Sequence, residues 1–273
     1  MRIYKRAKSI LELIAEKRLT TVAGAWVFFF LTSIIPLAFL LVTAFGVFKV
    51  DLSIQILAYL PEEFRPAGEA IVSTAEKASK GATLIFILTV IFSCSTLLNQ
   101  MSKDGDFIYG VKAKYKRGVM RRLWAIAAIA LLFIIFLLAA FLIAFGNTFF
   151  SGVKTDNIKR LISVVLAFTF IILLSYGVIL LLNRFACPIK LKISQLSVGS
   201  LCSLFVIVLG TIGFTVYLRF FNSYNAFYGS LAGIVVFLLW AYILMIGLVL
   251  GVIINSKINT ISKKDKIFQQ NLK

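Results

Sequence analysis

Six long apolar segments alternate along the chain with segments that hold all of its 29 Lys and Arg and 11 Asp and Glu residues. A membrane-spanning helix needs about 20 consecutive, mostly apolar residues, and each of these segments is long enough. The pattern therefore predicts an all-α fold, a polytopic membrane helix bundle with six transmembrane helices. The predicted spans are 22–48, 83–101, 123–149, 161–182, 198–218 and 227–254.

The basic residues are distributed unevenly between the spans. Segments 1–21, 102–122, 183–197 and the tail from 255 hold 21 of the 29 Lys and Arg residues. Because basic residues collect in cytoplasmic loops, we expect both termini in the cytoplasm. The apolar run after residue 21 is too long for the core of a signal peptide, so the first span is expected to stay as an uncleaved anchor.

Composition agrees with a membrane protein. The chain is 60% hydrophobic and 15% charged, whereas soluble domains carry about 25% charged residues. Its net charge of +18 raises the alternative of nucleic-acid binding. The basic cytoplasmic segments account for most of that excess, so we expect no nucleic-acid partner.

Two further segments have amphipathic patterns. Residues 1–21 are predicted to form a cytoplasmic amphipathic helix, either lying on the anionic inner leaflet or packed against the bundle. The outer loop 49–82 has apolar residues at helical spacing, which predicts one or two short amphipathic helices broken at Pro61 and Pro66. The expected domains are thus 1–21, a transmembrane domain 22–254 and a basic cytoplasmic tail 255–273.

The residues that usually carry catalysis are scarce. The chain has no His and three widely spaced Cys residues, so we expect no metal site, no catalytic residues and no cofactor. The spans contain no charged residue, which argues against a proton- or ion-coupled transporter with a buried carboxylate. Transport of amphipathic or lipidic molecules remains open.

Polar residues gather near the predicted cytoplasmic end of the second span. They are either partners in hydrogen bonds between helices or the lining of a polar site near the inner interface. These residues are Ser93, Ser95, Asn99 and Gln100.

The first and last two spans contain candidate structural or gating residues. Pro36 interrupts the first span and frees a backbone carbonyl, and Ser33 is one turn earlier and is expected to help satisfy the backbone. Small residues spaced by four positions let helices approach closely, either within one bundle or in a dimer. The glycines concerned are Gly199, Gly229, Gly233, Gly247 and Gly251.

Motifs along the chain resemble those of the YihY/BrkB family. The last span carries Tyr228 and Gly229, then Trp240 and Tyr242, then Leu250 and Gly251, which is similar to the family's C-terminal signature. Further similar elements are Ala25 and Trp26, Ser33 and Pro36, and Pro188 followed by Gly199. One departure is that Val252 and Ile253 follow Gly251, where relatives commonly carry an acidic residue.

The resemblance implies a bacterial protein of the cytoplasmic (inner) membrane with a role in the cell envelope. An old ribonuclease label in this family finds no support here, because the chain lacks His and a metal-ligand cluster. We expect a transporter, exporter or flippase for a lipid or an amphipathic envelope molecule, with membrane lipids as partners. The alternative is a non-transporting membrane scaffold for an envelope-assembly partner. Candidate protein partners are an envelope protein and a second copy of the chain. An intramembrane enzyme is the weakest hypothesis.

Overall fold

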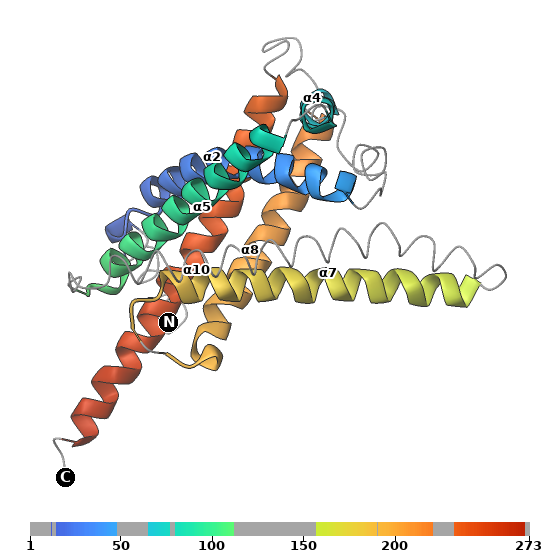
Figure 1. The fold of residues 1–273 in the computed structure, drawn as a ribbon. Helices are drawn as coiled ribbons and strands as arrows, with labels where there is room; N and C mark the ends of the chain where they lie inside the picture. The colour runs from blue at the N-terminus through green and yellow to red at the C-terminus, as the bar shows by residue number, and fades with distance from the viewer. Residues whose placement is uncertain are drawn as a thin grey trace.

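The computed structural model describes Glu12 and residues 15–47, 65–76, 80–111, 157–189, 191–220 and 232–270. Six α-helices hold most of these residues (Figure 1). Their bounds are α2 Leu19–Val47, α4 Arg65–Glu76, α5 Lys80–Tyr109, α7 Asn157–Ala186, α8 Ile193–Phe220 and α10 Ala232–Gln270.

Five of these helices are long and apolar enough to cross a membrane. The qualifying stretches are Leu19–Leu40, Leu84–Tyr109, Thr169–Ala186, Ile193–Phe220 and Gly233–Asn259. They confirm the predicted all-α membrane bundle. The expected third span, 123–149, is outside the described residues.

The helices pack mainly as two pairs. Figure 1 shows α2 beside α5, and α8 beside α10, and these are also the two most extensive helix contacts. The helix α10 touches α2, α5 and α7 as well and so joins the pairs. The helix α7 crosses the bundle near its own C-terminal end, and its beginning extends away from the other labelled helices (Figure 1).

The hydrophobic core lies mainly where α2, α5 and α10 meet. Trp26 is fully buried at its centre, together with apolar side chains from all three helices. Apolar residues that continue the core include Val22, Leu98, Met101, Ala241, Val249 and Ile253.

The helices extend beyond the apolar runs that predicted them. The helix α5 continues to Tyr109, two turns past the predicted end at 101, and therefore carries Asp104 and Asp106. The helix α10 runs through residue 254 without a break and ends at Gln270. Hydropathy marks where an apolar run ends, whereas a helix continues as long as its backbone hydrogen bonds do. The absence of charge holds for the predicted spans but not for these helices.

The helix α4 confirms a helix in the loop 49–82, and it packs against α2. Pro66 lies in its first turn, where the missing N–H has no intrahelical partner to lose. Pro66 therefore stands at the start of this helix, and Pro61 and the residues before Arg65 are outside the described residues. Ahead of α2, Arg18 adopts a φ of 50° and separates α2 from the short helical stretch at Ala15 and Glu16. Most of the expected N-terminal amphipathic helix lies outside the described residues.

The helices α5 and α7 reach the same region with their C-terminal ends, as the close approach of Gly105 to the Ala186 backbone shows.

Candidate functional site at the polar end of the bundle

Buried polar side chains gather at one end of the bundle. We call this region the polar end: α2 and α8 begin there, α5 and α7 end there, and α10 passes through it. Apart from Ser33, the buried polar residues in the described part of the chain all belong to it. They are Ser102, Asp106, Asn183, Ser200, Ser203, Asn255, Ser256 and Asn259.

Asn255 of α10 links three helices at the polar end. Its side-chain Nδ2 donates to Asn183 Oδ1 of α7 at 3.3 Å and to the Leu196 carbonyl oxygen of α8 at 3.1 Å. Its Oδ1 accepts a hydrogen bond from the Gly199 backbone N–H at 3.0 Å. One turn later, Asn259 Nδ2 donates to the Asn255 carbonyl oxygen at 2.8 Å. The amide of Asn255 is therefore fully bonded although it is excluded from solvent.

Two glycines allow Asn255 to reach α8. A Cβ on Gly199 would overlap the Gly251 carbonyl oxygen and the Asn255 amide, and a Cβ on Gly251 would overlap Ser203 Oγ. The backbones of α8 and α10 are in direct contact at this crossing. Any side chain larger than hydrogen would separate the helices and withdraw the amide from its partners.

A second polar contact joins α2 to α5. The Trp26 indole Nε1–H donates to Asp104 Oδ2 at 2.7 Å. Gln100, one turn earlier on α5, places its Nε2 at 3.1 Å from both Asp104 oxygens. Trp26 is fully buried, whereas Asp104 is half-buried. A carboxylate is thus held at the edge of the core by two neutral donors.

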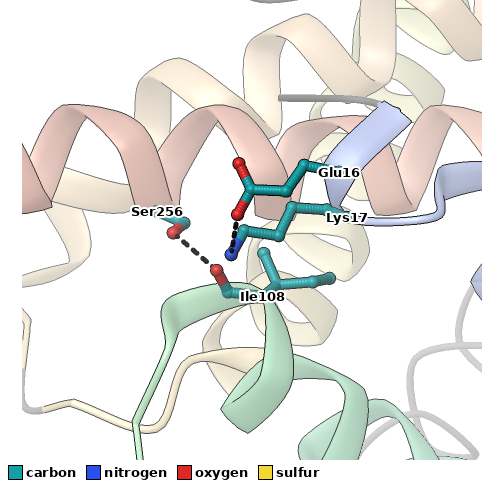
Figure 2. A network of polar contacts seen from close by, with 4 residues as sticks. All are labelled: Glu16, Lys17, Ile108 and Ser256. Atoms are coloured by element: carbon teal, nitrogen blue, oxygen red, sulfur yellow. Dashed lines mark hydrogen bonds and ion pairs between the residues drawn. The ribbon is translucent and has the colours of Figure 1, made fainter. Parts of the chain in front are cut away.

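The last turns of α5 are fixed to α10 and α7. Figure 2 shows Ser256 of α10 beside the backbone of Ile108, and its Oγ donates to the Ile108 carbonyl oxygen at 3.2 Å. Next to it, Lys17 forms an ion pair with Glu16, with 3.3 Å between Nζ and Oε1 (Figure 2). On the α7 side, a Cβ on Gly105 would overlap the Ala186 carbonyl oxygen. The polar end is consequently a junction of five helices.

Among the predicted lining residues, Gln100 is part of this junction: it bonds to Asp104 on its own helix, and Asp104 accepts from Trp26 of α2. Ser93, Ser95 and Asn99 are half-buried along α5. The distinction between lining and interhelical bonding therefore stays open for these three residues.

Ser33 and Pro36 are both buried in α2. The Ser33 hydroxyl donates to the Phe29 carbonyl oxygen at 2.7 Å. The carbonyl that Pro36 frees belongs to Thr32, four residues before the proline. Ser33 thus hydrogen-bonds locally, as expected, but to the carbonyl of Phe29 and not to the one that Pro36 frees.

The predicted glycines and aromatics of the last span lie along α10. Gly247 faces α8, where a Cβ would come within 2.6 Å of Ile207 Cγ1. The Tyr242 hydroxyl donates to the Thr20 carbonyl oxygen at 3.4 Å. Trp240 lies against Phe237 with 5.9 Å between the ring centroids. Gly233 is half-buried near the start of α10, while Tyr228 and Gly229 are outside the described residues.

Sequence reasoning missed the residues that form most of the junction. Asp104, Asn183, Asn255 and Asn259 all follow the predicted end of a span by one to five residues. Asn255 and Asn259 are spaced by four positions and so share one helix face. That spacing, directly after an apolar run, was the signal available in the sequence.

Metal chemistry has no obvious location in the structure. Within the described ranges, no group of three or more His, Cys, Asp or Glu residues is close enough to hold an ion. Cys94, Cys187 and Cys202 are free thiols.

The outer faces of the helices are strongly apolar. Large hydrophobic side chains are exposed in rows on α5, α7 and α8, with no described residue covering them. These rows include Leu84, Ile85, Leu88 and Phe92, then Phe170, Ile171, Ile172 and Leu173, then Phe205, Leu209, Ile212 and Phe220.

Long apolar helices with exposed apolar faces and a polar junction at one end define an integral membrane protein of the multi-pass helix-bundle class. The family model described as "Virulence factor BrkB" matches residues 10–271. The chain therefore belongs to the BrkB family.

Curated relatives carry the name UPF0761 membrane protein. A protein from Vibrio atlanticus is 24% identical over 264 residues, covering 90% of this chain and 79% of the relative. One from Aliivibrio fischeri is 23% identical over 250 residues, covering 87% and 78%. A Coxiella burnetii relative is 36% identical over 69 residues. That match spans 25% of each chain, so the present chain aligns with only a quarter of the Coxiella protein. No solved structure matches the chain.

Proposed function

We propose that this protein moves a lipid or another amphipathic molecule of the cell envelope across or out of the membrane. The observation that carries the proposal is the division of the bundle into a polar end and apolar flanks. An amphipathic molecule has the same division, since its headgroup needs polar partners and its chains need apolar ones. The headgroup would lie at the polar end and the chains along the exposed faces of α5 and α8.

The charges around the polar end support an anionic headgroup. Arg18, Lys103, Arg184 and Lys192 are exposed and lie at or beside the helix ends that form it. Basic residues at such positions attract anionic lipid headgroups, with a contribution of about 1 kcal/mol each. We further propose that the polar end faces the cytoplasm of a bacterium and that the protein lies in its inner membrane. The word virulence in the family description refers to relatives; an envelope role for this chain is our proposal, as is the absence of catalysis.

The experiment has two stages. Native mass spectrometry of the protein in a mild detergent shows whether a specific lipid is retained at fixed stoichiometry. The retained lipid, labelled with a fluorophore in its headgroup, is then tested in proteoliposomes for movement between leaflets. The Gln100→Ala variant is expected to slow this movement, because Gln100 belongs to the polar end. Thr89→Val is the matched control, since Thr89 is exposed on the same helix and its hydroxyl bonds to its own helix.

Two results together would contradict the proposal. The protein would retain no lipid, or lipids only in proportion to their abundance, and no lipid movement would be seen in proteoliposomes. The outcome would favour the second candidate, a scaffold for an envelope protein. One observation favours that candidate: α4 packs against α2 and exposes Glu69, Ser73 and Thr74. Crosslinking from these positions in intact cells would then search for a protein partner.

A further inference from the structure

Asp104 presents a half-buried carboxylate at the contact between α2 and α5. Within the described residues, no Lys or Arg nitrogen lies within 4.0 Å of it, although the chain carries 29 of these residues. Its hydrogen-bond donors are the neutral groups of Trp26 and Gln100. An ionisable residue in a membrane helix is costly and usually serves ion movement or a relay.

Two opposing effects act on the charge of Asp104. Removal from water favours the neutral, protonated acid, whereas N–H donors favour the carboxylate. The titratable side chains on the surrounding elements also have to be considered. They are Lys103, Asp106 and Tyr109 on α5, Arg184 on α7, Tyr242 and Lys257 on α10, and Glu16, Lys17 and Arg18 before α2. Lys103 is the neighbour of Asp104 in the chain, and a positive charge there favours the carboxylate.

We propose that Asp104 is a proton-binding site, and that its charge determines how firmly α2 is held to α5. In the carboxylate form, the Trp26 N–H makes a charge-assisted hydrogen bond to Oδ2, which is about twice as strong as a neutral one. One proton taken from water at the polar end converts the carboxylate to the neutral acid. The hydrogen bond is then weakened, and α2 is held less firmly against α5.

The rest of the α2–α5 interface allows such a movement. Pro36 removes one backbone hydrogen bond from α2 between Trp26 and Phe39. Beyond it, Phe39 stacks on Phe86 with 3.7 Å between the ring centroids. The stacked rings hold the far part of α2, so a bend at Pro36 lets the Trp26 part move alone. The consequence for lipid movement, namely control by protons, rests on the proposed function.

The test follows the environment of Trp26 directly. Trp124 and Trp240 are replaced by Phe, so that Trp26 is the only fluorophore of its kind. Its emission is recorded in detergent from about pH 4 to about pH 9, on both sides of the ordinary carboxyl range. We expect one sigmoidal change with pH. Asp104→Asn should abolish it and Glu16→Gln, the removal of an exposed acid nearby, should leave it intact.

A second variant guards against misfolding of Asp104→Asn. Gln100→Leu removes one N–H donor to the carboxylate and keeps the acid, so the midpoint should rise by about one pH unit. Emission that is independent of pH, or a transition that persists in Asp104→Asn, would overturn the proposal. A response to Na⁺ at constant pH that Asp104→Asn removes would also overturn it and assign sodium instead.

Lipid movement in proteoliposomes separates this inference from the proposed function. An Asp104-dependent transition of Trp26 without lipid movement would leave the proton site standing and contradict the transport proposal. Lipid movement that shows the same pH dependence in wild type and Asp104→Asn would contradict the control by protons alone.

Discussion

The two helix pairs of this bundle are held together in different ways. In α8 and α10, backbone meets backbone at Gly199 and Gly251, and one fully bonded amide, that of Asn255, fixes the register. In α2 and α5, large side chains fill the interface, with Trp26 on Asp104 at one end and Phe39 on Phe86 at the other.

The difference separates a rigid pair from an adjustable one. A backbone crossing without room for a methyl group has one good geometry, because any displacement either overlaps atoms or opens a gap. Contacts between long side chains can change rotamer, and a hydrogen bond to a carboxylate can change strength with its charge. We therefore expect α8 and α10 to act as the fixed frame and α2 and α5 as the part that moves.

The largest expected effect comes from enlarging the fixed crossing. Gly251→Val introduces side-chain atoms where Ser203 Oγ and the Gly199 carbonyl oxygen already lie. We expect a loss of more than about 3 kcal/mol in stability, at the upper end of overpacking costs, seen as a much lower unfolding temperature in detergent. Gly213→Val on α8 is the matched control, since nothing lies within 4 Å of a Cβ there. Equal stability of the two variants would refute the rigid crossing.

Removal of the Asn255 amide should be the next largest effect. Asn255→Ala leaves the Gly199 N–H, the Leu196 carbonyl and Asn183 Oδ1 without this partner. Hydrogen bonds between membrane helices contribute about 0.6 kcal/mol each on average, so a loss of about 2 kcal/mol is expected. Thermal unfolding measures it, with Asn99→Ala, a half-buried position on α5, as the comparison. An unchanged midpoint for Asn255→Ala would show that the amide does not fix the register.

Removal of the polar contact between α2 and α5 should cost less stability than removal of the Asn255 amide. Trp26→Phe keeps a six-membered aromatic ring but deletes the five-membered ring of the indole, with the N–H that donates to Asp104. We expect the lost hydrogen bond to account for about 1.5 kcal/mol, the lower end for a bond to a charged group, and the smaller ring to add a packing loss. Trp240→Phe, which makes a ring contact with Phe237, should be closer to neutral. A larger loss of stability for Trp240→Phe than for Trp26→Phe would contradict this and assign the stabilising indole to α10.

The stack of Phe39 on Phe86, at the other end of the α2–α5 contact, should contribute somewhat less to stability than the Trp26–Asp104 hydrogen bond. Phe39→Leu removes the ring that stacks on Phe86, and such ring pairs are worth about 1 kcal/mol beyond their buried area. Phe28→Leu, an exposed position on the same helix, serves as control. Equal unfolding temperatures would mean that α2 is not anchored at this stack.

Of these variants, Pro36→Ala should change stability least, and its main effect should be on lipid movement. Alanine restores the N–H that can bond to the Thr32 carbonyl, so stability should change by less than about 0.5 kcal/mol or increase. If α2 bends at this position, lipid movement in proteoliposomes should slow. Transport at the wild-type rate would count against bending and in favour of a scaffold.

The apolar runs sufficed to predict the five described helices that are long enough to span a membrane, since length and lack of charge are local properties. The glycine spacing also indicated a face of close contact, and Gly247 and Gly251 indeed face α8. Nothing local indicated that Asn255 would bond to Gly199, which is 56 positions earlier. Asp104 was assigned to a cytoplasmic loop because it follows the apolar run, although α5 continues past it and brings it to Trp26.

The helix α10 is much longer than the hydrocarbon layer of a membrane is thick. Its 39 residues extend over about 58 Å, nearly twice the roughly 30 Å of the hydrocarbon layer. The 15 residues after Asn255 form about 22 Å of continuous helix, and Figure 1 shows this end projecting past the other helices. Such a rod amplifies a small change of angle: if the α8–α10 pair tilts as a unit by about 10° relative to α2 and α5, the tip moves by about 4 Å relative to Asn255. A change of angle between the two pairs would thereby become a displacement of several ångströms at the end of α10.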